Sequence, residues 1–248
     1  MDSGWCWRID HETRINRGYV YSSAFITDEQ AEREFRGKNP KVEKTRIVPY
    51  VSGRYRDGWV KNVVGIGNAS GFVEPLESTS LAAICNEAHT LAELLATNDG
   101  CAPSPGEVRL YNRRHAFNWD SIRRFLAVHY KFNARLDTSF WRECREKTDL
   151  AGAEDVIENY LENGPTPIFS TTLLDQRDQF GMDGYLTMLM GQGVPHRKRY
   201  VPSPREQETW RDIHQKIGRE ASNGFTVPEA LRVVRSPQWV WPQGIYRY

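Results

Sequence analysis

A glycine-rich turn between an apolar run and a helix start most constrains this chain. The segment reads VKNVVGIGNASGFVEPLESTSL over residues 60–81. Gly65, Gly67 and Gly71 follow a GxGxxxG pattern, which differs from the GxGxxG dinucleotide fingerprint and lacks its βαβ context. Glycines still permit close backbone approach to a ligand. The amides of residues 78–80 would lie at a helix N-terminus, where partial positive charge collects. The pattern therefore favours an anion or a cofactor at this turn.

Charge and composition exclude several function classes. The chain has 33 Lys and Arg against 32 Asp and Glu, a net charge of +1 that argues against nucleic-acid binding. Aromatic residues make up 12% of the chain and supply enough apolar surface to exclude disorder. No apolar run approaches the roughly 20 residues of a membrane helix, and the first residues lack the pattern of a signal peptide. We therefore expect a cytoplasmic protein that binds neither nucleic acid nor membrane.

Cysteines and histidines predict no metal site. The four cysteines form no CxxC pair, so zinc ribbons and thioredoxin-like motifs are excluded and free thiols are expected. His89, His115 and His129 have no metal-ligand spacing. All three fall in predicted helices, where a histidine is more often a surface or core residue than a ligand.

The first seventy residues have the alternation that is typical of β-strands. Trp5, Trp7 and Ile9 alternate with polar residues. Further β-prone runs lie at Tyr19 to Ser22, Arg46 to Ser52 and Trp59 to Ile66. A short helix at Thr27 to Phe35 begins with a capping box. Four strands without a helical layer cannot bury both faces of a sheet. We therefore expect more of the sheet on the N-terminal side of this chain.

The chain after Ser78 has helical periodicity. The run from Ser78 to Ala96 predicts an amphipathic helix whose apolar face comprises Leu81, Ile84, Cys85, Ala88, Leu91, Ala92 and Leu95. The helix that starts at the Ser104 cap has Val108, Tyr111, His115, Trp119, Ile122 and Leu126 on one face. Further helix starts are predicted at Thr138, near Ala153, at Ser203 and at Thr226. Thr166 to Gln179 shows no regular pattern.

Several segments resemble the flavin-dependent tryptophan halogenase family. Gly67 to Ser80 is similar to the family's Phe-Leu-Glu-Pro-Leu-Glu-Ser-Thr signature, and Gly4 to Ile9 is similar to its Trp-x-Trp-x-Ile-Pro motif. Gly18 to Ser23 is similar to its Gly-Tyr-Val-Tyr-Ser-Ser run, and residues 124–130 and 137–141 resemble its helical half. The resemblance covers most of residues 4–146. Two positions depart from the family pattern: Asp10 replaces a proline, and Ser80 replaces a glycine.

The resemblance implies an α+β fold in two parts. Residues 1–80 would be the C-terminal part of a FAD-dependent monooxygenase-like flavin module of the GR2 type, with its last strands, a short helix and the GNASGFVEPLEST turn. Residues 81–248 would form a mostly α-helical substrate-binding module. The family's GxGxxG phosphate loop and its catalytic lysine have no counterpart here. We therefore expect the C-terminal portion of a longer enzyme, with the N-terminal half supplied in cis or in trans.

The resemblance also implies a reaction and its residues. An electron-rich aromatic, tryptophan or another indole-like molecule, would be halogenated with reduced FAD, O2 and halide (chloride or bromide) through hypohalous acid. A separate flavin reductase would supply the reduced FAD. By motif position, Glu77 matches the catalytic glutamate, and Thr79 and Ser80 match the halide site. The flavin-contacting positions are Gly67, Asn68, Ala69, Gly71, Phe72, Pro75 and Leu76. Trp5, Trp7 and Ile9 match a motif that is associated with suppression of hydroxylation.

Other interpretations stay open from the residues alone. Glu77, Thr79 and Ser80 also fit an ordinary first helical turn, and Trp5 and Trp7 fit core packing on a strand. Asp10 leaves open a flavin monooxygenase of the same fold that does not halogenate. The chain by itself could also be a catalytically silent fragment or a helper chain. Four aromatic residues of the helical half are candidates for lining a substrate pocket: Tyr185, Trp210, Trp239 and Trp241.

Overall fold

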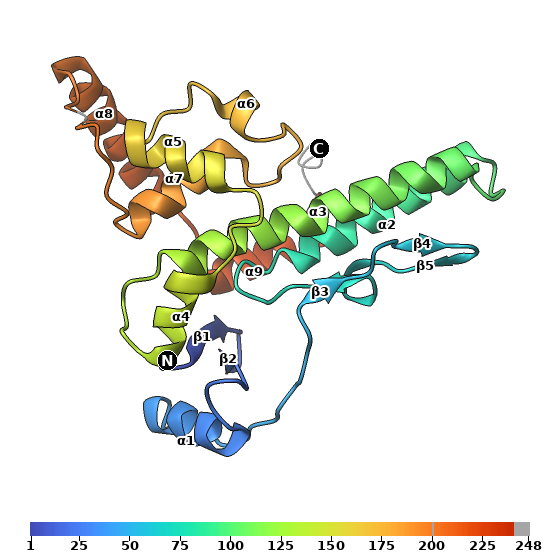
Figure 1. Ribbon diagram of the computed structural model, residues 1–248, viewed down its shortest axis with the longest axis horizontal. Helices are drawn as coiled ribbons and strands as arrows, with labels where there is room; N and C mark the ends of the chain where they lie inside the picture. Colours follow the sequence, from blue (N-terminus) through green and yellow to red (C-terminus); the bar gives the residue numbers. More distant parts are fainter. Residues whose placement is uncertain (200, 241–248) are drawn as a thin grey trace. The chain divides into compact units, whose positions relative to one another are not determined.

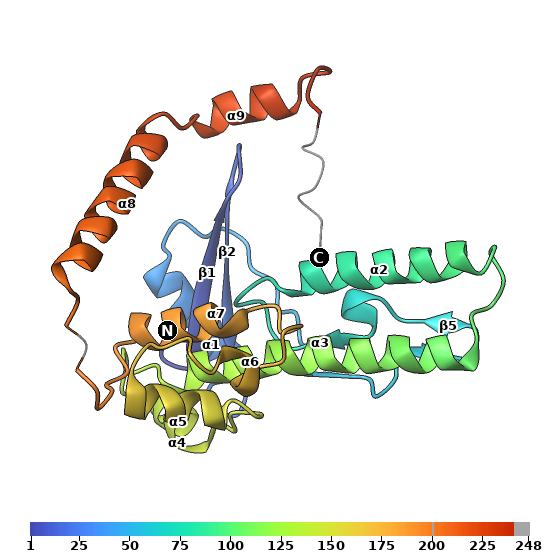
Figure 2. The ribbon, with the colours of Figure 1, turned by 90° about the horizontal axis from the view of Figure 1, so that it is seen from above.

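Helix α3 (Pro105–Lys131) is the element around which most of the chain packs. It starts as predicted, with a reciprocal capping box between Ser104 and Glu107 and a proline in its first turn. Its predicted apolar face is confirmed, because the following side chains are buried: Tyr111, His115, Trp119, Ile122 and Leu126. Helix α2 (Ser80–Thr97) runs alongside α3 (Figure 2).

The structure, a computed structural model, describes residues 1–199 and 201–240. These residues divide into two units. The first consists of Met1–Arg8 and Arg17–Arg199, and the second of Ile9–Asn16 and the described residues after 200. Helices α8 (Pro204–Ser222) and α9 (Val227–Val234) belong to the second unit (Figure 1). No helix in the described ranges is both long and apolar enough to span a membrane.

The first unit has two hydrophobic clusters that meet on α3. The larger joins the C-terminal half of α3 to α5 (Glu154–Asn163) and α7 (Gly181–Gly191), with Val128, Tyr160 and Leu189 at its centre. The smaller places Ala83 of α2 against Trp119, Ile122 and Leu126 of α3. Helix α4 (Ser139–Lys147) also packs on α3.

The described strands are short and form three two-stranded sheets. β1 (Gly4–Asp10) pairs with β2 (Ile15–Tyr21), and β3 (Gly53–Arg54) pairs antiparallel with β6 (Gly71–Phe72). β4 (Trp59–Val60) pairs antiparallel with β5 (Val63–Val64). The first two predicted strands are therefore confirmed.

Two strand predictions are wrong. Arg46 to Ser52 forms no strand, and its apolar side chains are largely exposed, with Val51 at 90%. Strand propensity alone does not make a strand here, because no described strand pairs with the run to complete a ladder. Trp59 to Ile66 is interrupted at Lys61, whose φ of +56° reverses the chain between β4 and β5.

The helices follow their caps closely. α1 (Asp28–Lys38) has the predicted Thr27 and Gln30 capping box, and Thr138 caps α4. Ser203 and Thr226 cap α8 and α9, and α5 ends at Gly164. Two helices were not predicted: α6 (Ser170–Leu173), a single turn within the irregular stretch, and α7. Helix α7 is apolar on most sides and its N-terminus has no side-chain cap, so neither periodicity nor capping marks it.

The apolar face predicted for α2 is not the buried one. Within the described residues α2 buries Ala83 and Glu87, whereas Leu81 is 65% exposed and Ile84, Cys85 and Leu95 are also exposed. The prediction of the helix is confirmed, but its apolar stripe faces away from α3. Exposed apolar residues in a row on one helix are typical of a surface that is covered in the complete assembly.

Candidate functional site

The loop between β6 and α2, residues 73–79, is anchored by Glu74. This side chain is 8% exposed. Its Oε2 accepts hydrogen bonds from Trp5 Nε1 at 2.9 Å and from the Tyr130 hydroxyl at 3.0 Å, and its Oε1 accepts from the Leu76 N–H at 2.8 Å. Burial raises the pKa of Glu74 above its ordinary value near 4.5, and the three donors oppose that shift. Glu74 thus ties the loop to β1 and α3.

The pKa of Glu74 predicts a pH dependence of stability. A carboxyl whose folded pKa is raised stabilises the fold below its unfolded pKa, and this contribution is lost as the pH rises through the folded value. Glu74→Gln cannot titrate. We therefore expect the difference in unfolding free energy between wild type and this variant to fall as the pH rises from the ordinary carboxyl range through the raised pKa of Glu74, measured by urea denaturation. Parallel profiles over that range would contradict this assignment.

The same loop contains a strained residue beside Glu77. Ser78 has a φ of +53°, a left-handed conformation that non-glycine residues rarely adopt. Its N–H donates to the Pro75 carbonyl and its carbonyl accepts from the Leu81 N–H, so two backbone bonds hold it there. This turn leaves Glu77 and Ser78 exposed and starts α2 at Ser80. Strained backbone of this kind gathers at functional sites because the surroundings must impose it.

Glu77 pairs with a histidine of α3. Its Oε1 lies 2.7 Å from His129 Nε2, across 52 residues of sequence. His129 Nδ1 lies 3.0 Å from the carbonyl oxygen of Phe125, one turn earlier in the same helix. The expectation that His129 is an ordinary surface or core residue is therefore incomplete, because it contacts the predicted catalytic glutamate.

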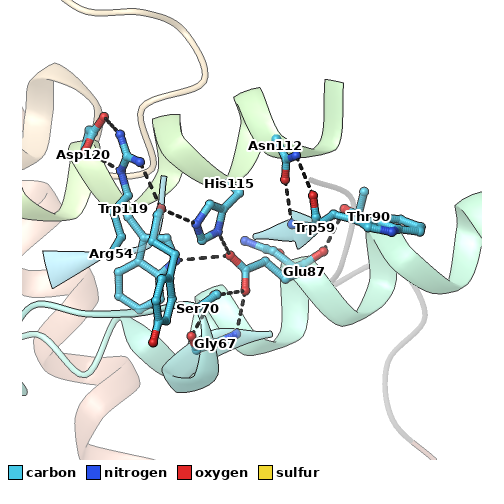
Figure 3. A network of polar contacts seen from close by, with 12 residues as sticks. Arg54, Trp59, Gly67, Ser70, Glu87, Thr90, Asn112, His115, Trp119 and Asp120 are labelled. Atoms are coloured by element: carbon cyan, nitrogen blue, oxygen red, sulfur yellow. Dashed lines mark hydrogen bonds and ion pairs between the residues drawn. The ribbon is translucent and has the colours of Figure 1, made fainter. Parts of the chain in front are cut away.

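A buried polar network contacts the inner face of the glycine-rich turn and holds it in place (Figure 3). Glu87 of α2 accepts from the Gly67 N–H at 2.6 Å and from Trp119 Nε1 at 3.2 Å, and its carboxylate lies 2.9 Å from His115 Nδ1. Ser70 Oγ lies 3.3 Å from the same carboxylate. The Glu87 side chain is 3% exposed and that of His115 is fully buried. A buried carboxylate thus takes hydrogen bonds from both neighbouring segments and fixes the turn.

Two partners hold the His115 ring in the core. Nε2 lies 3.3 Å from the Tyr55 carbonyl oxygen, which can only accept, so Nε2 is a donor. Nδ1 lies 2.9 Å from the Glu87 carboxyl group, a hydrogen-bond distance. His115 is a core histidine, as predicted, and its partner is a buried acid.

Glycine is required where the turn meets the helices. Gly67 has a φ of +56°, and a Cβ there would lie 2.1 Å from the Ile84 side chain. A Cβ on Gly71 would lie 2.8 Å from the Trp119 ring. Both glycines are buried, whereas Asn68 and Ala69 between them are exposed. The turn, which includes the 3-10 segment η1 (Gly67–Ala69), therefore has one face on the protein and one open face.

The other predicted site residues flank this turn and loop. Phe72 packs edge-on against Tyr50 with 5.0 Å between ring centroids. Phe72, Pro75, Leu76, Thr79 and Ser80 are all partly buried. Thr79 is the N-cap of α2 but its side chain caps no backbone amide, so the helix start keeps its partial positive charge.

The three residues of the tryptophan motif do not all belong to the same unit. Trp5 and Trp7 are partly buried in the first unit; Trp5 bonds Glu74, and the Trp7 ring covers Gly18. Ile9 lies in the second unit and is 51% exposed. No metal-binding group of three His, Cys, Asp or Glu side chains occurs in the described ranges. All four cysteines are free thiols, as predicted.

The candidate pocket aromatics do not gather at one place. Tyr185 is fully buried in the larger hydrophobic cluster, so its proposed place on a pocket wall is wrong. Trp241 lies outside the described residues. Trp210 is 65% exposed on α8. Trp239 lines a hollow of about 510 Å³ in the second unit together with Phe225 and Arg232.

The residues that the sequence analysis missed are Glu74, Glu87 and the pairings of His115 and His129. Two signals in the sequence could have identified His115 and Glu87 as buried polar residues. His115 and Trp119 are four residues apart on the apolar face of a predicted helix, which places a polar group in the core. Glu87 lies four residues after Ala83 on the same helix and so shares its face. The partner of each side chain, however, is set by tertiary packing.

Comparisons with known proteins agree with the segments that the sequence analysis matched. A family model described as tryptophan halogenase matches residues 1–205. Tryptophan 7-halogenase RebH of Lentzea aerocolonigenes is 35% identical over 163 residues, which cover 64% of this chain and 30% of RebH. The 7-chloro-L-tryptophan 6-halogenase KtzR of a Kutzneria species is 32% identical over 196 residues, which cover 78% of this chain and 37% of KtzR.

Solved structures give the same result at the level of the fold. MibH, a tryptophan 5-halogenase, superposes with a TM-score of 0.83 and 35% identity over 94% of this chain and 45% of MibH. BrvH, a flavin-dependent halogenase from Brevundimonas sp. BAL3, gives a TM-score of 0.78 and 27% identity. The chain spans less than half the length of these relatives, and its mostly helical fold with few strands corresponds to part of theirs. Its sequence and its fold together place this chain in the tryptophan halogenase family.

Proposed function

We propose that this chain is the C-terminal part of a FAD-dependent halogenase that acts on an electron-rich aromatic such as tryptophan or another indole. Residues 1–80 complete its flavin module, of the GR2 type, and residues 81–248 form its substrate module. The observation that carries the proposal is the loop at residues 73–79, where the motif glutamate Glu77 is exposed next to a strained Ser78 and paired with His129. The family match over residues 1–205 supports it.

The exposed apolar stripe of α2 supports the role as one part of a larger enzyme. Leu81, Ile84 and Leu95 are exposed on a helix that directly follows the candidate site. An N-terminal half that carries the GxGxxG loop and the catalytic lysine, in the same chain or in a partner, would bury such a surface. The relatives are more than twice as long as the part of them that this chain matches.

The glycine-rich turn fits one edge of a flavin. Its inner face is occupied by Glu87 and Trp119, while Asn68 and Ala69 remain exposed. Close backbone approach is possible on the open face, and the Asn68 side chain offers a donor and an acceptor. FAD, reduced by a separate flavin reductase, supplies the oxygen chemistry when bound. The Glu87 network holds the turn in place for that contact.

Glu77 is proposed to accept the proton that the aromatic carbon loses after halogen addition. A carboxylate near the ring also stabilises the positive charge that develops there. Trp5 supports this geometry from a distance, because it bonds Glu74 and so fixes the loop. Trp7 and Ile9 complete the motif on β1.

The start of α2 is proposed to hold the halide. The amides of Thr79 and Ser80 lie at a helix N-terminus that has no side-chain cap. Ser80→Asp places a negative charge there, which stabilises the helix but repels an anion. We expect the KM for bromide to rise about fivefold or more, because like charges about 4 Å apart cost at least about 1 kcal/mol. Ser80→Asn is the neutral control of the same size. Equal halide KM values for the two variants would argue against this site.

The test of the proposed function is the mass of the product formed by the complete enzyme, this chain together with its N-terminal half. Reduced FAD is regenerated by a flavin reductase, and tryptophan and a panel of indoles and phenols are offered with bromide. We expect a product with the isotope doublet of bromine. A hydroxylated product in its place would support the non-halogenating monooxygenase. Flavin oxidation without any change to the aromatics would contradict the proposal.

A further inference from the structure

The Glu77 and His129 pair has a geometry that fixes where its protons lie. His129 Nδ1 lies 3.0 Å from the Phe125 carbonyl oxygen, which has no proton to give. Nδ1 therefore carries a hydrogen and donates it. That bond within α3 sets the tautomer and the orientation of the ring, as it does for other functional histidines.

The second ring nitrogen then requires another proton. Nε2 lies 2.7 Å from Glu77 Oε1, a hydrogen-bond distance. With Nδ1 already protonated, a neutral ring would present a lone pair to a carboxylate, and the two would repel. A proton therefore lies between Nε2 and Oε1 and joins the two side chains in one hydrogen bond.

Packing holds the ring in this position. The Phe125 ring meets the His129 ring edge-on, with 4.9 Å between centroids and 81° between planes. Phe125 is itself stacked on Phe180 at 3.9 Å, so the ring rests on the larger hydrophobic cluster. The His129 side chain is 12% exposed and that of Glu77 is 34% exposed. Solvent therefore reaches the carboxylate more freely than the imidazole.

The neighbouring glutamate shows what distinguishes Glu77. Glu74 takes its three hydrogen bonds from an indole, a phenol and a backbone amide, which are neutral donors. Its burial raises the pKa of its carboxyl and so favours the protonated form. Glu77 receives its bond from a group that can carry charge. Two carboxyls three residues apart therefore have different partners: Glu74 is buried among neutral donors, whereas Glu77 is exposed and meets a histidine.

We propose that His129 is a positioning residue of the halogenation site: its hydrogen bond through Nε2 holds the Glu77 carboxyl group in one orientation. This inference rests on the proposed function. Oε1 is occupied by the shared proton, so Oε2 is the oxygen left to take the proton from the aromatic carbon. In that step the C–H bond of the cationic ring breaks, its electron pair restores aromaticity, and an O–H bond forms on Glu77.

The test compares His129→Ala, His129→Gln and wild type in the complete enzyme. The readout is halogenated product per flavin oxidised, together with the rate of flavin oxidation and the KM for the aromatic. For His129→Ala we expect the yield per flavin to fall about tenfold or more, with flavin oxidation and the aromatic KM within about twofold of wild type. Added imidazole restores part of the yield by filling the space of the lost ring. His129→Gln keeps an N–H donor without the imidazole ring and gives an intermediate yield.

His89→Ala is the matched control, since His89 is an exposed histidine on α2 that pairs with Glu93. Its yield should equal that of wild type. A wild-type enzyme that halogenates, combined with an unchanged yield from His129→Ala, would overturn this inference and leave the proposed function intact. A fall that imidazole does not restore, with flavin oxidation reduced in step, would indicate a purely structural role and also overturn it. A wild-type enzyme that makes no halogenated product would overturn the proposed function, and this inference with it.

Discussion

Glu77→Gln in the complete enzyme is expected to reduce halogenated product by about 10²-fold or more, the range of a lost general base. Glutamine keeps the size of the side chain and can still accept from His129, but it cannot take a proton. The rate of flavin oxidation should not change, because Glu77 is not assigned a role in that step. The measurement is product formed per flavin oxidised, by mass spectrometry and absorbance.

Glu93→Gln is the matched control for this substitution. Glu93 lies on α2 with an exposed side chain, and its partner is the exposed His89. The control should leave the yield unchanged. Halogenation by Glu77→Gln at the wild-type rate would remove Glu77 from the mechanism and return it to the role of an ordinary first-turn carboxylate.

Glu87→Leu should have the largest effect on stability. The substitution leaves three buried groups without their partner: His115 Nδ1, the Gly67 N–H and Trp119 Nε1. Each buried polar group left unpaired typically costs about 1–3 kcal/mol, so we expect a loss of about 3–5 kcal/mol. Urea denaturation of the chain, followed by tryptophan fluorescence, measures the loss directly because Trp119 is part of the network.

Two further variants test the cause of that loss. Glu93→Leu, on the exposed side of α2, should change the unfolding free energy by less than about 0.5 kcal/mol. Glu87→Leu combined with His115→Leu should cost less than the sum of the single substitutions, because neither side chain is then left without its partner in the core. A loss below about 1 kcal/mol for Glu87→Leu would contradict the stabilising role of this network.

Local signals were enough to predict the described helices other than α6 and α7. Ser104 with Glu107 and Thr27 with Gln30 are capping boxes within one turn, so no distant partner is needed to form them. Two of the four strand predictions failed for the opposite reason. Arg46 to Ser52 has strand composition, but a strand forms only by pairing with a neighbour, and no described strand pairs with this run.

In the candidate site too, local features could be predicted from the sequence and distant contacts could not. The order of Glu77, Ser78 and Thr79 is readable as a motif, and the strain at Ser78 follows from the turn that joins β6 to α2. The partners are distant in sequence: His129 is 52 residues from Glu77, and His115 is 28 residues from Glu87. Helical periodicity identified the buried face of α3 but could not say which acid each histidine would meet.

The most direct test of the central claim, that this chain is one part of a flavin-dependent halogenase, is the DNA sequence upstream of the Met1 codon in the source organism. We predict a reading frame that encodes a GxGxxG loop and a suitable lysine, either continuous with this chain or in a separate gene for a partner. Every assay above that uses the complete enzyme depends on that segment. A stop codon in frame before Met1, with no second gene for such a half anywhere in the genome, would contradict the account.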